Sequence, residues 1–412
     1  MKNLFFIALA ALFVFSCSND DDVIVAQCGK PQNVSANNIT FNSATIDWDN
    51  NSSTSYTIEY GVSGFTLGTG TSADVSDNSA DLSSLDANTT YDVYVRTNCS
   101  ATNTSMYTDA ESFTTAAPLV VPQFTTNLSD MYIYQGNMSD LNPSPYVFEY
   151  DLNTPLFTDY AHKQRLIALP PETTMDYIDD GFPDFPDNTV ITKSFYYLND
   201  ERDASQGKYI IETRVLIKIE GNWQLGNYKW NNDQTDAVLD DTSSHVLVDY
   251  IDANGTTQNV DYVIPSAQQC FDCHSNASQV TPIGPKLRTM NFNNQLQDFI
   301  NAGHLGNLTD PSTVATLPDW SDDVNYTLEE RARAYFDINC AHCHQVGGFC
   351  EFQSQLRLTY ETPFAESYIL ERSSSIDNRM RNYNEGFSMP LIGTSMVHNE
   401  GYALIYEYLN SL

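Results

Sequence analysis

The chain has 412 residues, of which 53 are Asp or Glu and 19 are Lys or Arg, so its formal net charge is −34 at pH 7. This length corresponds to about three domains of ordinary size, and the hydrophobic fraction of 41% excludes a wholly disordered chain. The strong negative charge argues against nucleic acid and against anionic membrane surfaces as partners.

The first residues have the composition of an export signal. Residues 1–3 carry a positive charge, and the apolar run at residues 4–15 is too short to span a bilayer. The Ser-Cys pair that follows resembles the lipobox of bacterial lipoproteins, which implies that a signal peptide at residues 1–16 is removed and that Cys17 is acylated. An ordinary signal peptide with an incidental cysteine is the alternative. Residues 17–27 would form an acidic tether.

Acylation at Cys17 would anchor the protein to a membrane, because each buried methylene adds about 0.8 kcal/mol. The acidic stretch after Cys17 also resembles the export signal of surface-displayed lipoproteins in some Gram-negative bacteria. We therefore expect an outer-membrane lipoprotein that faces the periplasm or the cell surface.

Residues 28–117 have the alternation of an all-β sandwich. Apolar and polar residues alternate at residues 44–48, 56–61 and 91–97, which predicts three strands. The segment resembles a fibronectin type III module, in which the Tyr91 hydroxyl would bond to nearby backbone at a strand corner. Such modules serve mostly as spacers or binding platforms.

Two cysteines, Cys28 and Cys99, lie in this β-rich region. Disulfides form in exported proteins, so we predict that these two residues pair.

The residue pattern at 122–265 predicts a second β-rich domain. The sequence does not indicate the role of this domain. Residues 190–197 and 209–219 are β-branched and aromatic runs typical of strands. Turn signals at residues 220–222 and 252–255 predict hairpins.

The C-terminal third contains two Cys-x-x-Cys-His motifs. Two thiols three residues apart reach the two vinyl groups of one haem, and the next residue, His, is then placed under the iron. With eight Cys and seven His in the chain, chance would produce one such motif about 0.003 times. We predict two covalently bound haem c groups, attached at Cys270, Cys273 and His274, and at Cys340, Cys343 and His344.

Other uses of paired cysteines fit the pattern less well. A zinc site more usually combines two Cys-x-x-Cys pairs in one compact unit and needs no His directly after each pair. A thioredoxin-like dithiol lies in a βαβ unit, which this region does not predict. Cys350 follows the second motif, and the sequence assigns it no role.

The second motif lies in residues 326–412. The helix patterns of this segment predict an all-α, cytochrome c-like region. A helix at residues 327–338 begins with Thr327 and Glu330 spaced as a capping box, and a last helix covers residues 399–409. The Met-Pro pair before this last helix resembles the distal-ligand loop of small cytochromes, which makes Met389 the expected sixth ligand of the second iron.

The first motif lies in residues 266–325, with a short helix expected at residues 294–302. The stretch 283–287 resembles the Gly-Pro-x-Leu segment that follows the motif in class I cytochromes. This resemblance implies that the Pro285 carbonyl accepts the His274 N–H. Met290, His304 or a vacant position remain open for the distal side of this iron.

Residues 145–412 as a whole resemble a family of bacterial di-haem c-type cytochromes whose reaction is not assigned. The segments that carry this resemblance are 150–160 (YDLNTPLFTDY), 199–203 (NDERD), 211–214 (IETR) and 337–344 (DINCAHCH). The expected fold is therefore multidomain: an N-terminal all-β sandwich, a central β-rich domain and a C-terminal all-α region with two haems.

The leading functional hypothesis is electron transfer with an unidentified redox partner protein, with no catalytic residue assigned. One alternative is a haem enzyme of the peroxidase or oxidase kind, with the first haem open to a small substrate. A second alternative is a surface binding protein in which the haems are accessory. The short spacing between the motifs, residues 276–326, predicts that the haems lie close enough for electron transfer between them.

Overall fold

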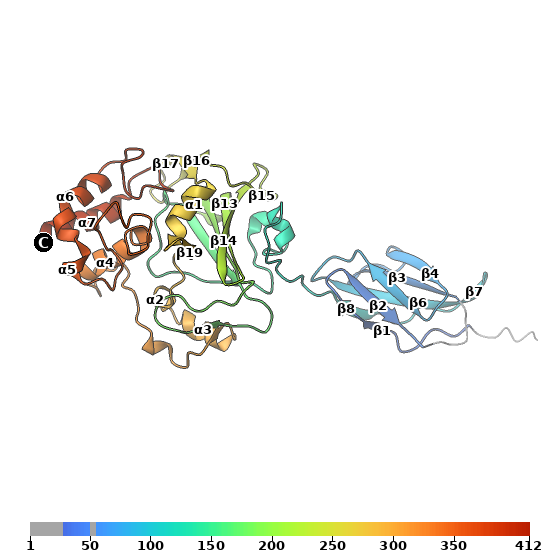
Figure 1. The fold of residues 1–412 in the computed structure, drawn as a ribbon. Helices are drawn as coiled ribbons and strands as arrows, with labels where there is room; N and C mark the ends of the chain where they lie inside the picture. The colour runs from blue at the N-terminus through green and yellow to red at the C-terminus, as the bar shows by residue number, and fades with distance from the viewer. Residues whose placement is uncertain (1–27, 50–54) are drawn as a thin grey trace, which may run out of the picture. The chain divides into compact units, whose positions relative to one another are not determined.

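The computed structural model describes residues 28–49 and 55–412. The chain forms two compact units that divide between Pro118 and Leu119 (Figure 1). The expected signal peptide, the lipidation site Cys17 and the acidic tether lie outside the described residues, so they stay predictions. Every helix in the described part of the chain is too short or too polar to cross a membrane.

Short strands with alternating side chains fold the N-terminal unit into a β-sandwich. Ile46, Ile58 and Val93 are at most 1% exposed and pack in the core between the sheets, because alternate residues of a strand face the same side. The Tyr91 hydroxyl accepts a hydrogen bond from Asp86 N at 2.9 Å, as predicted for the strand corner. One sheet contains β1 (Ser35–Asn37), β2 (Ser43–Asp47) and β5 (Ser79–Ser83), and the other β4 (Thr71–Val75), β3 (Tyr56–Val62), β6 (Thr90–Ser100), β7 (Asn103–Thr104) and β8 (Glu111–Thr114).

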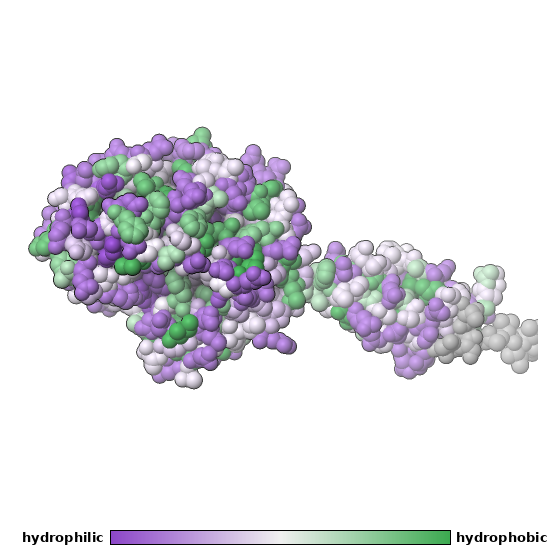
Figure 2. Space-filling view, viewed as in Figure 1, coloured by the Kyte–Doolittle hydropathy of each residue, from purple (hydrophilic) through white to green (hydrophobic). Residues whose placement is uncertain are grey.

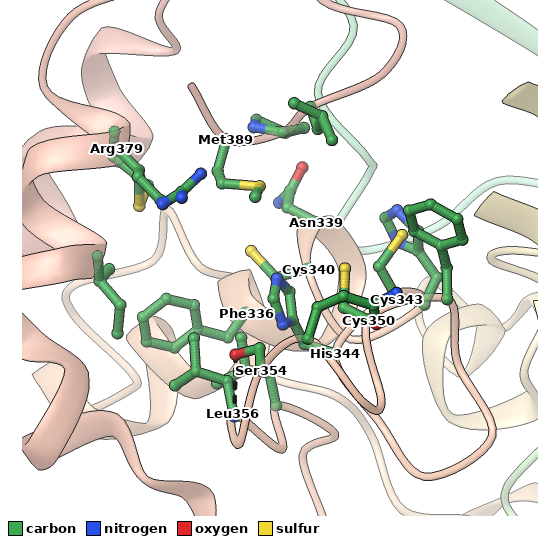
Figure 3. A pocket seen from close by; sticks show the side chains of 18 of the residues that line it. Phe336, Asn339, Cys340, Cys343, His344, Cys350, Ser354, Leu356, Arg379 and Met389 are labelled. Atoms are coloured by element: carbon green, nitrogen blue, oxygen red, sulfur yellow. Dashed lines mark hydrogen bonds between the residues drawn. The ribbon is translucent and has the colours of Figure 1, made fainter. Parts of the chain in front are cut away.

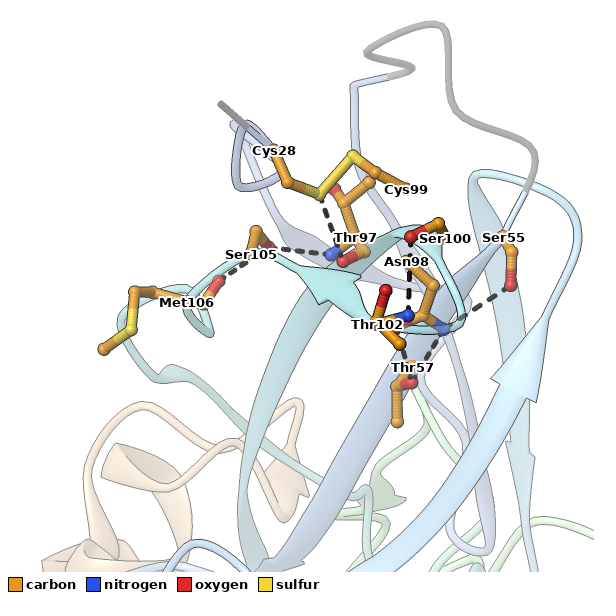
Figure 4. The surroundings of a disulfide bond; sticks show 10 residues. All are labelled: Cys28, Ser55, Thr57, Thr97, Asn98, Cys99, Ser100, Thr102, Ser105 and Met106. Carbon is orange, nitrogen blue, oxygen red and sulfur yellow. Dashed lines mark hydrogen bonds between the residues drawn. A yellow bond between two sulfur atoms is a disulfide. The ribbon is translucent and has the colours of Figure 1, made fainter. Parts of the chain in front are cut away.

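A disulfide joins Cys28 to Cys99, as predicted, and ties the start of this unit to the end of β6 (Figure 4). Hydrogen bonds hold the strand beside it, since Thr97 N donates to Ser105 Oγ at 2.9 Å. The cross-linked residues are 71 positions apart, so the bond restricts a long loop of the unfolded chain.

A six-stranded antiparallel sheet forms the centre of the larger unit. The predicted runs at residues 190–197 and 209–219 are its central strands, and the predicted turns follow them at Gly221 and, in a separate hairpin, at Gly255. The sheet order is β15 (Ala237–Leu239), β14 (Asn222–Trp230), β13 (Lys208–Ile219), β12 (Val190–Leu198), β10 (His162–Ala168) and β9 (Phe148–Glu149), and the hairpin is β16 (Ser244–Ile251) and β17 (Thr257–Ile264).

Short elements surround this sheet. Two small pairs are parallel β11 and β20 and antiparallel β18 and β19. Their bounds are β11 (Met175–Asp176), β20 (Leu305–Gly306), β18 (Ser275–Asn276) and β19 (Gln279–Val280), with 3-10 turns η1 (Leu128–Met131), η2 (Met138–Asp140), η3 (Ala204–Gln206) and η4 (Pro311–Thr313), and helices α1 (Ala267–His274), α2 (Leu287–Met290) and α3 (Gln295–Asn301).

Both faces of the large sheet are buried. Ile191 and Leu216 are cross-strand partners that pack against side chains of α2 and α3. Val190 and Ile217, one position along each strand, pair on the opposite face and pack against η1. Because successive side chains of a strand point to opposite faces, burial of both faces explains the continuous apolar runs.

Residues 326–412 fold into helices and loops, as expected. The helix α4 begins at Thr327, whose hydroxyl accepts Glu330 N while the Glu330 side chain accepts Thr327 N, so the predicted capping box is confirmed. Tyr335 on this helix packs against Leu404 and Ile405 of the last helix. The helices are α4 (Leu328–Asn339), α5 (Phe364–Ser367), α6 (Ile369–Met380) and α7 (Asn399–Ser411).

The protein is therefore multidomain and β-rich, with an N-terminal sandwich and helices gathered at the C-terminal end. The boundaries expected at residues 265/266 and 325/326 lie inside the compact unit 119–412. Leu287 and Phe299, which belong to the first motif's segment, share one core with the sheet.

Candidate functional site

The helix α1 carries the whole first motif. Its N-cap is Ser266, and the Ser266 N–H donates to the Gln269 side chain at 2.9 Å, which completes a capping box that the sequence analysis missed. Cys270, Cys273 and His274 lie three and four residues apart on the helix, so they share one face.

A tight hairpin fixes the His274 imidazole. The strands β18 and β19 turn the chain back directly after the motif, so that Thr281 N donates to His274 O at 2.7 Å. The His274 Nδ1 atom lies 2.8 Å from the Thr281 carbonyl oxygen. The carbonyl acceptor is therefore that of Thr281 and not that of Pro285, because the hairpin returns the chain to His274 four residues before Pro285.

Burial sets the protonation of this ring. Desolvation lowers the pKa of His274 to about 3, and nearby cations act in the same direction. The imidazole is therefore neutral at physiological pH, donates Nδ1–H to Thr281 and keeps the lone pair of Nε2 free.

The second motif forms a turn at the end of α4. Cys340 is the C-cap residue, and Cys343 N and His344 N donate back to the Cys340 carbonyl at 3.2 Å and 3.0 Å. Burial lowers the pKa of His344 to about 4, so this imidazole is neutral as well. Its Nδ1 is buried and has no hydrogen-bond partner among the described residues.

A cavity of about 320 Å³ opens beside this turn. Cys340, Cys343, His344 and Met389 line it together, and Met389 projects into it from the loop before α7, on the far side from His344 in this view (Figure 3). Met389 N donates to the Arg379 carbonyl at 3.0 Å, which attaches the loop to α6.

The Met389 loop is also attached to the β-rich part of the unit. Ser395 donates from its backbone N and from its hydroxyl to Asp159 Oδ2, each at 2.8 Å. The position of Met389 thus depends on a residue more than 200 positions earlier in the chain.

A smaller cavity of about 50 Å³ lies beside the first motif, lined by Cys273, His274, Lys193, Arg214 and His342 among others. The two residues predicted as possible distal ligands of the first iron lie elsewhere.

Met290 is fully buried in the core with Leu287 and Phe299. His304 stacks on Phe148 with ring centroids 4.0 Å apart. Neither Met290 nor His304 lines the cavity at either motif.

The fold brings the two motifs together. Cys273 Sγ, Cys343 Sγ and a ring nitrogen of His342 lie within 4.8 Å of one another. Ala277 N donates to the Gly347 carbonyl at 2.8 Å, so the segments that follow the two motifs are joined through their backbones. The motifs are two halves of one site.

Several residues of this site were missed by the sequence analysis. His342 lies between the cysteines of the second motif but faces the first motif's cavity, with a buried Nδ1 that has no partner among the described residues. Lys193 and Arg214 lie on strands that were predicted, but only the strand register brings them to α1. Cys350 lines the larger cavity, and its N–H donates to the Cys343 carbonyl.

Comparison with known proteins identifies the smaller unit. Residues 29–113 match the family model for the fibronectin type III domain. These residues are a fibronectin type III domain. The search of curated proteins finds no match to the chain.

Solved fibronectin type III domains are similar to part of the chain. The FN5 domain of Drosophila Lar is 20% identical, covers 22% of this chain and 99% of its own, and gives a TM-score of 0.20. The fn3 domain of the human collagen alpha-1(XX) chain is 23% identical, covers 23% of this chain and 90% of its own, and gives a TM-score of 0.21. The fn3 domain of human contactin 1 is 18% identical, covers 27% of this chain and 100% of its own, and gives a TM-score of 0.21.

Proposed function

We propose that residues 119–412 carry two covalently attached haem c groups and that the protein transfers electrons to or from an unidentified redox partner protein. The observation that carries this proposal is the meeting of two Cys-x-x-Cys-His motifs in one site, with Met389 and His344 facing the same cavity. Haem iron bound there would supply one-electron redox chemistry.

The donor atoms at the second motif suit a haem. A neutral imidazole, two thiols and a thioether face a cavity of about 320 Å³, within the range of small-ligand sites. Phe336, Leu356, Leu358 and Ile376 give this cavity apolar walls. Cys340 and Cys343 would hold the haem, His344 would be the proximal ligand, and Met389 the sixth ligand.

The first motif has the same donors but less room. Cys270, Cys273 and His274 adjoin a cavity of about 50 Å³, so neighbouring side chains must move to admit a macrocycle. The residues that line this cavity supply few donors for the sixth position. His342 is the best placed of them, because its imidazole has a free buried nitrogen and lies beside Cys273.

This arrangement gives the two sites different roles. Ligation by His and Met raises the potential of a c-type haem. A second haem held by His344 and Met389 would therefore attract electrons from a first haem held by two imidazoles. The 4.8 Å grouping of Cys273, Cys343 and His342 supports direct transfer between adjacent haem edges.

The remaining parts of the chain agree with an exported electron carrier. A disulfide such as Cys28–Cys99 forms in oxidising compartments outside the cytoplasm, where haem c is also attached. Acylated Cys17 would anchor the protein to the outer membrane, facing the periplasm or the cell surface. The fibronectin type III domain would act as a spacer, and the largely hydrophilic face seen in Figure 2 suits an aqueous setting.

A second candidate function follows from the same cysteines. Cys273, His342 and Cys343 lie within 4.8 Å of one another, and Cys350 follows close to Cys343. Three thiolates and one imidazole are a common ligand set for tetrahedral structural zinc. In that case the site would stabilise the fold and carry no electrons.

A haem count separates these candidates. We expect two covalent haems per chain by the pyridine haemochrome assay in protein from cells that have haem-attachment machinery. The double variant C340A/C343A should lose one haem, and C270A/C273A the other. A haem-free protein that contains one zinc ion per chain would refute the cytochrome proposal.

A further inference from the structure

One side of α6 presents polar side chains to the cavity of about 320 Å³ at the second motif. Arg372, Ser375 and Arg379 all line this cavity. They are three and four residues apart, so they form one stripe along the helix. Ile376 and Met380 line the cavity beside this stripe and pack into the apolar core with α4 and α7. The border between the apolar and the polar side of α6 therefore runs along the cavity.

The two arginines of this stripe lack an acidic partner. Arg379 donates Nη1–H to the Phe387 carbonyl at 2.8 Å and lies over the Phe387 ring. Arg372 donates Nη2–H to the Gln355 side chain at 2.8 Å. Among the residues that the structure describes, neither guanidinium forms an ion pair with a carboxylate. In a chain with a net charge of −34, the cavity thus has two cations that an added anion could neutralise.

The two arginines lie on the side of the cavity where the carboxylates of a haem would be. Each pyrrole of haem c that bears a thioether is diagonally across the ring from a pyrrole that bears a propionate. In Figure 3, Arg379 lies across the cavity from Cys343, with Met389 between them in this view. Arg372 and Ser375 are exposed, so the stripe borders the open side of the cavity. A haem would meet apolar walls with its ring and solvent-accessible cations with its acidic edge.

We propose that Arg372 and Arg379 bind the propionate carboxylates of the haem attached at the second motif, with the Ser375 hydroxyl as a further donor. This inference rests on the proposed function, because it requires a haem at Cys340 and Cys343. A guanidinium can donate two parallel hydrogen bonds to one carboxylate, which adds direction to the attraction between the charges. Arg372 and Arg379 are two helical turns apart, about 10 Å along α6, so they can serve two separate carboxylates.

The main test is the double variant R372M/R379M in the full-length protein, with haem count, redox titration and resonance Raman spectra measured together. Since a nearby cation favours the reduced iron, we expect the midpoint potential of one haem to fall and that of the other to stay constant. The propionate bending mode of one haem should shift. Two haems should remain attached, and R372K/R379K should restore most of the potential, because lysine keeps the charge.

Arg381→Met is the matched control. Arg381 directly follows α6, but it pairs with Asp377 and does not line the cavity. Its removal should change neither the potentials nor the propionate mode. If the double variant loses one haem, the single variants Arg372→Met and Arg379→Met decide. Each should keep two haems and show a smaller fall of one potential, and single variants without such a fall would overturn the proposal.

Other outcomes would overturn this inference while leaving the cytochrome proposal intact. Unchanged potentials and Raman modes in a two-haem double variant would show that no propionate lies there. A change of one haem to high spin with an unchanged propionate mode would mean that Arg379 only holds the Met389 loop. A shift in the wild-type potential on titration with inorganic phosphate, absent from the double variant, would identify a free anion as the occupant. A wild-type protein without haem would refute both proposals.

Discussion

Met389 and His344 reach one cavity from segments 45 residues apart, as the numbering in the sequence shows. We expect Met389→Ala to leave both haems attached but to change one ferric haem from low to high spin, because a thioether ligand is removed without touching the thiols. Absorption and electron paramagnetic resonance spectra measure this. Met396→Ala is the control, since Met396 packs elsewhere, beside the β16–β17 hairpin. An unchanged spectrum of the Met389 variant would exclude Met389 as ligand.

His342 leads to a separate expectation at the first haem. His342→Ala should also produce one high-spin haem, and added imidazole should return it to low spin by occupying the vacated position. His304→Ala and Met290→Leu are the controls, because neither residue lines the cavity at the first motif. If the His342 variant keeps both haems low-spin, another group holds that position.

A single residue, Asp159, should make the free energy of unfolding depend on pH. Burial raises the pKa of this carboxyl to about 6, above the value of about 3.9 in unfolded chains. The folded state therefore binds more protons than the unfolded state between about pH 4 and 6. The contribution of Asp159 to stability is greatest below pH 4 and decreases as pH rises through 6.

We expect Asp159→Asn to remove this dependence. The amide stays neutral, can accept the Ser395 hydrogen bonds, and tolerates the φ of +49° at this position. Relative to the wild type, the variant should gain up to about 3 kcal/mol of unfolding free energy between pH 4 and pH 7.5. Urea unfolding at both pH values measures the difference. The control is Asp298→Asn, at an exposed carboxyl. If the unfolding free energy of Asp159→Asn changed with pH as much as that of the wild type, the prediction would be contradicted.

At the scale of elements, one buried carboxylate joins three segments around the second motif. Asp337 on α4 is 1% exposed in its side chain and accepts from Arg288 Nη2 of α2 at 2.9 Å. It also accepts from Tyr360 N at 3.0 Å, in the loop before α5. These bonds fix α4, and with it Cys340, against the sheet-packed helix α2.

Removing the Asp337 carboxylate should lower the free energy of unfolding. Asp337→Ala leaves Arg288 buried with less compensation, and loss of one partner of a buried pair typically costs about 3–5 kcal/mol. We expect a loss of this size in urea unfolding of the C-terminal unit. Asp337→Asn keeps acceptors for Tyr360 N and should cost less. Two variants of equal stability would indicate that the charge is unimportant here.

At the scale of the whole molecule, the two compact units should unfold separately on heating. The Cys28–Cys99 bond lies wholly within the smaller unit, which contains the fibronectin type III domain. C28S/C99S should destabilise that domain by about 2–5 kcal/mol, because the disulfide no longer restricts its unfolded chain. Differential scanning calorimetry should show one transition moved to lower temperature. The haem spectrum should not change, and any change in it would show that the units are coupled.

Much of the fold followed from local patterns. Alternation, as at β3, a run of β-branched and aromatic residues, as at β13, and the Thr327–Glu330 capping box are signals that a few neighbouring residues carry. The Tyr91 corner is of the same kind. These predictions succeeded because the interactions that decide them join residues near in sequence.

Other residues could not be located in this way. Thr281, rather than Pro285, accepts from His274, since the β18–β19 hairpin shortens the return of the chain. Met290 has the right chemistry for an iron ligand, but α2 buries it in the core beneath the sheet. Sequence spacing alone does not indicate which face of a short helix is covered.

The sequence by itself determined which donor groups the candidate site contains, because the Cys-x-x-Cys-His spacing of each motif is a local property of the chain. Only the tertiary structure decided how the parts meet. It placed Cys273 beside Cys343, and it brought Lys193 and Arg214 to α1 through the register of β12 and β13. Register depends on pairing between distant strands and on which face is buried, so no short segment encodes it.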